Sequence, residues 1–231
     1  MPKSKKPSTA AATASTPSGS KSSYSSAPIF FFKDDEKPYG CFCQWYQAPF
    51  TYHGLEFPDG QQFLCAEQFY MWRKAMHFGD TDTAREIVKE KNPRKQKALG
   101  RGVKGFTDEE WDKCMLNDVT LTSSTDTFIV KVQYCEEASM LKYTQCVTRE
   151  DDGNGPNVPL KDVLLQTGDR ELFEASPFDK IWGIGVKAEV AQSGGASRKT
   201  WGLNLLGKSL MKTRDVLRAR EEGGPALKGE S

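Results

Sequence analysis

The segment at residues 62–78 is apolar almost all the way round when it is drawn as a helix, yet it carries an acid and a base. At about 100° per residue, Glu67 and Lys74 fall within about 20° of one another. A helix with apolar residues on every side is buried, and a buried charge is costly unless it is paired. The long Lys74 side chain can reach back toward Glu67, because helical side chains lean toward the N-terminus. Two interpretations stay open: an ion pair that only holds the helix in register, or an acid and an amine that line a pocket.

Helical periodicity recurs along most of the chain, whereas strand signals are few and short. Thr107 and Glu110 form a capping-box pattern, Pro93 suits a first helical turn, and Asn204 can cap a last helix. The predicted helices lie at 62–78, 81–91, 93–99, from Thr107 to about Asn117, within 128–143 where 135–142 favours helix, in a short helix closing at 163–166, and at 205–220. The predicted strands lie at 29–32, at 50–57 with a hairpin turn at His53-Gly54, and at 171–176. We therefore expect an α+β fold, predominantly helical with a small β part, in a single domain at 29–220.

The two ends of the chain differ in composition from its middle. Residues 1–28 are almost entirely Ser, Ala, Thr, Pro, Lys and Gly, and residues 221–231 are rich in Gly, Pro and Glu. Such segments bury too little apolar surface to offset their ordering entropy, so we predict two disordered tails. Five lysines and no acid fall in residues 1–33, which leaves residues 34–220 at about −2 within a net charge of +1. A nearly neutral folded part argues against nonspecific nucleic-acid binding but still allows a local basic patch.

Hydropathy and cysteine usage indicate an intracellular protein, cytoplasmic or nuclear. There is no run of about 18 apolar residues and no apolar stretch near the N-terminus, so we expect neither a membrane span nor a secretory signal. The thiols would then be reduced. The cysteines are Cys41, Cys43, Cys65, Cys114, Cys135 and Cys146. Because Cys41-x-Cys43 is not a metal spacing and His53 and His77 are the only histidines, we expect no metal and no cofactor. The sequence gives no indication of an oligomeric state.

Several short motifs follow one another between about residues 40 and 220. They are Phe42-Cys43-Gln44-Trp45-Tyr46, Glu67-Gln68-Phe69-Tyr70, Lys74-Ala75, Pro93-Arg94, Ala98-Leu99-Gly100-Arg101, Glu174-Ala175-Ser176-Pro177-x-Asp179, Trp182-Gly183-Ile184-Gly185 and Trp201-Gly202-x-Asn204-Leu205-Leu206-Gly207. In this combination and order they resemble the NADAR (YbiA-like) family of N-glycosidases. Cys43-Gln44 stands where Ser-Asn is usual in the family, and Gln68 stands where His is usual. The stretches near 117–130 and 146–160 look longer than the family's connections and could shape access or contact a larger substrate.

The resemblance implies cleavage of a bond between C1′ of a ribose and a nitrogen base, without a metal or redox cofactor. Breaking that bond develops positive charge on the sugar, which a nearby carboxylate can stabilise. Among the acids in the matching motifs, Glu67 and Asp179 are the expected catalytic residues, with Glu67 expected nearest the reacting carbon. Lys74 could bind an oxygen, donate a proton, or form a Schiff base with the opened ribose.

Aromatic and glycine positions in the same motifs are the expected substrate contacts. Flat bases need stacking surfaces, and phosphates need cations or a close main chain. The expected substrate-binding residues are Trp45, Tyr46, Tyr70, Arg101, Trp182, Gly183, Gly185, Trp201 and Asn204. For each aromatic residue among them, a purely structural role in the core is the alternative.

Two substrate classes are compatible with the resemblance. One is ADP-ribose attached to guanine in DNA or RNA, which the lysine-rich N-terminal segment favours because a basic arm can lie along phosphates. The other is a phosphoribosylamino-pyrimidine intermediate of riboflavin biosynthesis, which the nearly neutral middle of the chain favours. A third hypothesis, from another class, is a module that binds ADP-ribose or NAD without cleaving it.

Overall fold

The computed structural model describes residues 27–113 and 129–223. The predicted tails therefore lie outside the described residues, apart from 27–28 and 221–223. Most of the stretch near 117–130 also lies outside them, as do Cys114 and the predicted end of a helix near Asn117. Within the described ranges, no helix combines the length and the apolar character that crossing a membrane requires.

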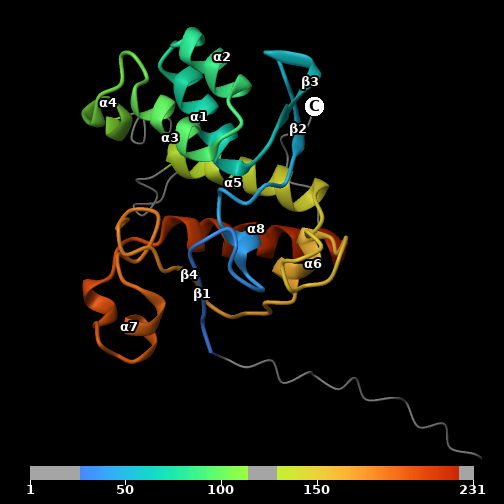
Figure 1. The fold of residues 1–231 in the computed structure, drawn as a ribbon, viewed down its shortest axis with the longest axis vertical. Coiled ribbons are helices and arrows are strands. Elements are labelled where there is room, and N and C mark those ends of the chain that lie inside the picture. Colours follow the sequence, from blue (N-terminus) through green and yellow to red (C-terminus); the bar gives the residue numbers. More distant parts are fainter. Residues whose placement is uncertain (1–26, 114–128, 224–231) are drawn as a thin grey trace, which may run out of the picture.

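Helices dominate the described chain, and two small sheets accompany them (Figure 1). The helices are α1 (Ala66–His77), α2 (Thr81–Lys89), α3 (Pro93–Arg101), α4 (Asp108–Lys113), α5 (Ile129–Gln145), α6 (Leu160–Leu165), α7 (Ala188–Gln192) and α8 (Leu205–Glu221), with single 3-10 turns at Gly40–Phe42 and Arg198–Thr200. Strand β1 (Ile29–Phe31) pairs in parallel with β4 (Leu172–Glu174), and β2 (Phe50–Gly54) pairs antiparallel with β3 (Phe57–Phe63). The predicted α+β class, predominantly helical, is confirmed.

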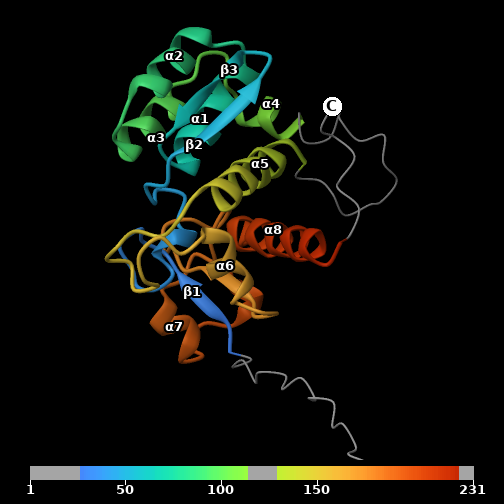
Figure 2. The same cartoon turned by 90° about the vertical axis from the view of Figure 1, so that its right-hand side faces the viewer.

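Helix α5 lies between two groups of elements (Figure 2). On one side α1 packs against α2, α3 and the β2–β3 hairpin. On the other side α8 packs against α6 and β4, which carries β1. Because α5 contacts both α1 and α8, the two groups share one core, and the loops that cross between them can form a common cavity.

A cluster of aromatic rings joins the β2–β3 hairpin to α1. The rings of Phe63 and Phe69 stand edge to face with centroids 5.1 Å apart, and Trp72 lies 5.3 Å from Phe63. All three side chains are almost completely buried. Burying such rings contributes about 1.5–3 kcal/mol each, so this cluster fixes α1 in place.

The start of α1 differs from the prediction, because residues 62–63 belong to strand β3 and the helix begins at Ala66. The buried Gln68 side chain explains the boundary. Its Oε1 accepts the N–H of Leu64 at 2.7 Å, and its Nε2 donates to the carbonyls of Ile87, Val88 and Glu90 at 2.9–3.0 Å. One amide therefore satisfies main-chain groups before α1 and at the end of α2.

Asn204 precedes α8 as predicted, but its side chain does not cap that helix. The residue adopts left-handed backbone angles with φ of 54°. Its Oδ1 accepts the N–H of Glu174 at 3.0 Å, and its Nδ2 donates to the carbonyl of Leu172 at 2.8 Å. The predicted capping role is therefore wrong, since the amide extends the hydrogen bonding of strand β4 instead.

Candidate active site

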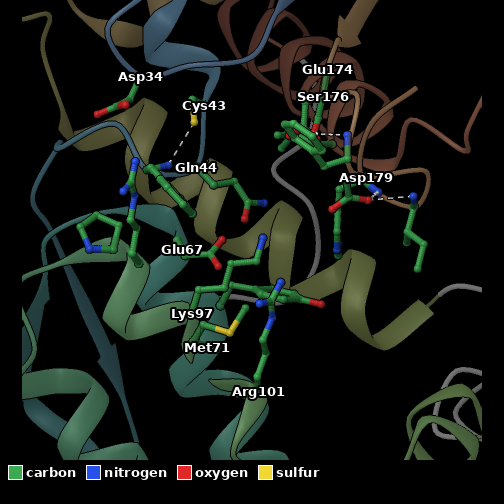
Figure 3. A pocket seen from close by; sticks show the side chains of 18 of the residues that line it. Asp34, Cys43, Gln44, Glu67, Met71, Lys97, Arg101, Glu174, Ser176 and Asp179 are labelled. Atoms are coloured by element: carbon green, nitrogen blue, oxygen red, sulfur yellow. Dashed lines mark hydrogen bonds between the residues drawn. The ribbon is translucent and has the colours of Figure 1, made fainter. Parts of the chain in front are cut away.

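A cavity of about 1430 Å³ opens where the α1–α3 group meets the β1–β4 pair. Its wall combines residues 32–35 after β1, residues 43–45, the inner face of α1, one face of α3, and the segment 174–182 that leaves β4. Figure 3 shows acidic and basic side chains from these separate elements around one space. Its volume exceeds the about 300–1,000 Å³ that is usual for small-molecule sites.

Glu67 lies in the first turn of α1 and is only 4% exposed. Its main-chain N–H donates to the carbonyl of Gln44 at 3.1 Å, which joins the helix to the loop before it. Its Oε1 is shielded from solvent and has no hydrogen-bond partner among the described residues. Burial raises the pKa of Glu67, while the charge of Lys97 and the Trp45 side chain lower it and Asp179 raises it further. Glu67 thus lines the cavity with a carboxyl oxygen that no described group satisfies.

Glu174, the last residue of β4, is a second cavity acid, which the sequence analysis did not select. Its Oε2 is shielded from solvent and also has no partner among the described groups. Burial raises the pKa of Glu174 to about 8; Asp179 adds to the shift and Lys97 opposes it. The one sequence signal was an acid near the end of a predicted strand, in a matching motif.

Asp179 also lines the cavity, and it organises the loop after β4. Its Oδ1 accepts the N–H groups of Ile181 and Trp182, each at 2.8 Å. The Trp182 ring then stands edge-on to the ring of Tyr70, with centroids 5.3 Å apart. Both rings line the cavity, so Asp179 places an aromatic wall beside the acids.

Lys74 lines the cavity from the later part of α1. Its Nζ donates to the carbonyl of Gly100 at 2.8 Å and lies 3.5 Å from the centroid of the Phe106 ring. Burial lowers the pKa of Lys74, and the Asp108 carboxylate opposes that shift. Among the described side chains the amine is thus bonded to main chain rather than to Glu67. The structure therefore does not support an ion pair between Glu67 and Lys74 that holds the helix in register. Both side chains line the same cavity instead.

Helix α3 supplies a cationic wall, defined here as Arg94, Lys97 and Arg101. An open side pocket of about 270 Å³ adjoins the main cavity along this wall, and the Trp45 indole and Ala98 also line it. The Nζ atom of Lys97 lies 5.8 Å from the centroid of the Trp45 ring. The arrangement offers positive charge and a stacking surface next to the buried acids.

Five of the nine expected substrate contacts lie away from the cavity lining, and three of them, Tyr46, Trp201 and Asn204, have structural roles. Tyr46 is fully buried in the core, where its hydroxyl donates to Asp152 Oδ2 at 2.8 Å and accepts the N–H of Arg149 at 2.9 Å. Trp201 packs edge to face on Phe173, with centroids 5.1 Å apart. The Asn204 side-chain amide is hydrogen-bonded to the main chain of strand β4 at Glu174 and Leu172.

Gly183 and Gly185 also lie outside the cavity lining, and local geometry explains why glycine stands there. A Cβ atom on Gly183 would come within 2.7 Å of the carbonyl oxygen of Glu174. Gly185 has φ of 69°, a conformation that glycine adopts without strain. These glycines shape the segment that carries Asp179 and Trp182.

The three departures from the family pattern differ in their location. Cys43 and Gln44 line the cavity, and the Gln44 amide donates to Cys135 Sγ at 3.1 Å. Gln68 is buried at the α1–α2 junction instead, so its change from histidine does not alter the cavity wall. Two of the three departures thus lie in the cavity wall, where we expected a changed donor or acceptor, and the third does not.

The stretch 146–160 braces the site rather than lining it. Arg149 donates to the carbonyl of Asp34 at 2.6 Å, and Asn154 donates to the carbonyl of Pro38 at 2.6 Å. Asp34 belongs to the cavity wall. This long connection therefore acts on the cavity through the segment after β1.

Lys142, a lysine that the sequence analysis passed over, supports the loop that carries Gln44 and Trp45. It is 1% exposed, and its Nζ donates to the carbonyls of Cys41 and Cys43 at 2.7 and 3.0 Å. Burial lowers the pKa of Lys142. In the part of the chain that the structure describes, no group of three or more His, Cys, Asp or Glu side chains could hold a metal ion.

The fold and the cavity define a small α+β protein whose buried carboxyls and cationic wall suit the chemistry of a charged glycoside. Residues 30–218 match the NADAR domain, so the chain belongs to the NADAR family. It is 34% identical over 193 residues to N-glycosidase R617 of Acanthamoeba polyphaga mimivirus, which covers 81% of this chain and 94% of that protein. It is 30% identical over 190 residues to N-glycosidase Npun_R5314 of Nostoc punctiforme, covering 82% and 92%. The resemblance found in the sequence is confirmed.

The NMR structure of the E. coli protein YbiA has the same fold. The two structures align with a TM-score of 0.56 at 20% sequence identity, over 89% of this chain and 94% of that one. This agreement supports the single-domain α+β architecture.

Proposed function

We propose that this NADAR-family N-glycosidase removes ADP-ribose from guanine bases of nucleic acid by hydrolysing the bond between C1′ of the ribose and a base nitrogen. The observation that carries the proposal is that one large cavity is lined both by carboxyl groups and by a cationic wall. Glu67 and Glu174 lie on the acidic side, and the α3 cations lie beside the Trp45 indole. A ligand with a reacting ribose, a diphosphate and a second base needs both parts.

The acids suit the sugar end of such a ligand. Loss of the base leaves positive charge on C1′, and a carboxylate close to that carbon stabilises it. Glu67 fits this role because its Oε1 is buried without a partner and its α3 neighbours, Lys97 and Arg101, favour the ionised form. Tyr70 and Trp182 offer apolar surface on the same side for a flat base.

Lys74 fits a supporting role near the sugar. Its lowered pKa increases the neutral fraction of the amine, and its hydrogen bond to Gly100 fixes its position. From that position it can bind a ribose hydroxyl, donate a proton, or add to the aldehyde of an opened ribose. Incubation with substrate and borohydride separates the last option, because only a Schiff base leaves a reduced adduct on Lys74.

The cationic wall suits the diphosphate end. Phosphate oxygens accept charge-assisted hydrogen bonds from Lys and Arg, worth about 1.5–3 kcal/mol each. The side pocket has a volume of about 270 Å³ and the Trp45 indole on its wall. It could hold the adenosine group of a ligand whose ribose lies beside the acids. A phosphoribosylamino-pyrimidine carries a single phosphate and would leave much of this surface unused.

The test compares two substrates by mass spectrometry of their products. An oligonucleotide with ADP-ribosylated guanine should yield free ADP-ribose and the intact oligonucleotide, at a higher kcat/KM than release of ribose 5-phosphate from a phosphoribosylamino-pyrimidine. Turnover of the pyrimidine alone would refute the proposed substrate and make the enzyme a metabolic N-glycosidase. Binding of ADP-ribose without turnover of either substrate would favour a non-catalytic module.

A variant of the cationic wall tests the diphosphate contact separately. Lys97→Met should raise KM for the ADP-ribosylated oligonucleotide by about 10- to 100-fold, the equivalent of one lost charged hydrogen bond. Lys95→Met is the matched control, since Lys95 is exposed on the same helix and does not line the cavity. Equal KM values for the two variants would refute the proposed contact between the diphosphate and the cationic wall.

A further inference from the structure

Two carboxyl groups with unpartnered oxygens face one cavity from unrelated elements, Glu67 from α1 and Glu174 from the end of β4 (Figure 3). Hydrolysis of an N-glycosidic bond requires two different catalytic roles from such groups. One stabilises charge at the sugar or activates water, and the other supplies a proton to the departing nitrogen. Two acids in one site divide these tasks when their neighbours differ.

The neighbours of the two groups do differ. Burial and Asp179 raise the pKa of Glu67, but Lys97, the Trp45 side chain and Arg101 oppose that shift and favour the ionised form. Glu174 has Asp179 and Glu67 as acidic neighbours and Lys97 as its one opposing cation among the described groups. The thiols of Cys43 and Cys135 also lie near Glu174, and Asp34 lies on the same cavity wall.

We propose that Glu174 is the general acid of this site and protonates the leaving base nitrogen. This inference rests on the proposed N-glycosidase reaction. As the C1′–N bond breaks, its electron pair stays on nitrogen, which takes the Glu174 proton. Water forms the new C1′–O bond and loses a proton to the Glu67 carboxylate, and exchange with solvent returns both groups to their starting states. One C–N bond is exchanged for one C–O bond, and no oxidant or reductant is needed.

The main chain holds Glu174 rigidly enough for this task. Its N–H donates to the Asn204 side chain and its carbonyl accepts the N–H of Ile184 at 2.8 Å, while its side-chain Oε2 has no partner among the described groups. Burial and nearby acids raise the pKa of Glu174 to about 8, so the carboxyl keeps its proton at neutral pH. Asp179, another cavity acid, already accepts two main-chain N–H bonds through its Oδ1.

The test compares leaving groups that need a proton with one that does not. The substrates are the ADP-ribosylated guanine oligonucleotide, the phosphoribosylamino-pyrimidine, and ADP-ribose joined at the same ribose carbon to 4-nitrophenol, which departs without a proton. Glu174→Gln should lower kcat on the nitrogen-linked substrate by about 100- to 10,000-fold but on the nitrophenyl substrate by less than about tenfold. The fall in wild-type kcat with rising pH near 8 should also be absent from the residual activity of the variant.

Glu189→Gln, an exposed acid on α7 away from the cavity, should leave all rates unchanged. Equal losses on both leaving groups in a folded Glu174→Gln protein would overturn the general-acid assignment. If the wild type cleaves the pyrimidine but not the guanine substrate, the proposed substrate fails, and the same leaving-group comparison still decides the role of Glu174. A wild type inert toward every substrate overturns both.

Discussion

Asn204 is predicted to stabilise the strand that carries Glu174 rather than to contact substrate. Asn204→Ala leaves the Glu174 N–H and the Leu172 carbonyl without their partners, at about 1–3 kcal/mol each. The left-handed backbone at φ of 54° adds about 1 kcal/mol for a residue with a Cβ. We expect the free energy of unfolding to fall by about 3–7 kcal/mol, and the melting temperature by roughly 6–28 °C.

Asn157 offers a matched control, because it has φ of 57° but is exposed and its side chain makes no hydrogen bond within the described residues. Asn157→Ala should cost about 1 kcal/mol, the strain contribution alone, and Asn157→Gly about nothing. Urea unfolding followed by tryptophan fluorescence measures all three variants. A cost for Asn204→Ala no larger than that for Asn157→Ala would refute the claim that its two hydrogen bonds hold β4.

Two further predictions concern Tyr46 and Glu174. Tyr46→Phe should lower the free energy of unfolding by about 1–3 kcal/mol, because Asp152 loses a buried donor, and should leave kcat/KM within about twofold; a large rise in KM would instead make Tyr46 a substrate contact. The pKa of Glu174 is raised from 4.5 to about 8, so the folded state binds more protons than the unfolded state in that interval and stability falls as pH rises through it. Glu174→Gln should therefore gain stability relative to the wild type between pH 5 and pH 9 in unfolding titrations, and a constant difference would contradict this explanation.

Local signals in the sequence were enough to predict most helices. Pro93 and Asn92 mark the start of α3, where the Asn92 side chain accepts the N–H of Arg94 at 2.9 Å. The start of α1 was predicted too early because an apolar run such as Phe63-Leu64-Cys65 fits a strand or a helix equally. Its true boundary depends on Gln68, whose partners lie on a different helix, and a single-segment pattern carries no such information.

The site was only partly predictable for the same reason. Glu67 and Lys74 were found because charges on an apolar helix are unusual, and the structure brings both to the cavity. Glu174 gave no comparable signal, since the cavity that it lines is formed by segments far from β4 in the sequence. Tyr46 and Trp45 are neighbours in one motif, yet one ring is in the core and the other is at the cavity. Periodicity cannot distinguish the two rings, because both belong to an irregular loop. The conformation of that loop depends on hydrogen bonds from the distant Lys142 to the carbonyls of Cys41 and Cys43.

The central claim is that the cavity around Glu67 cleaves a ribosyl C1′–N bond. The most direct measurement pairs single-turnover cleavage of the ADP-ribosylated guanine oligonucleotide with calorimetric binding, for the wild type and Glu67→Gln. We expect the wild type to release free ADP-ribose, and Glu67→Gln to lose that release by at least about 100-fold while it still binds the oligonucleotide within about tenfold of the wild type. Unchanged cleavage by a folded Glu67→Gln protein would contradict it.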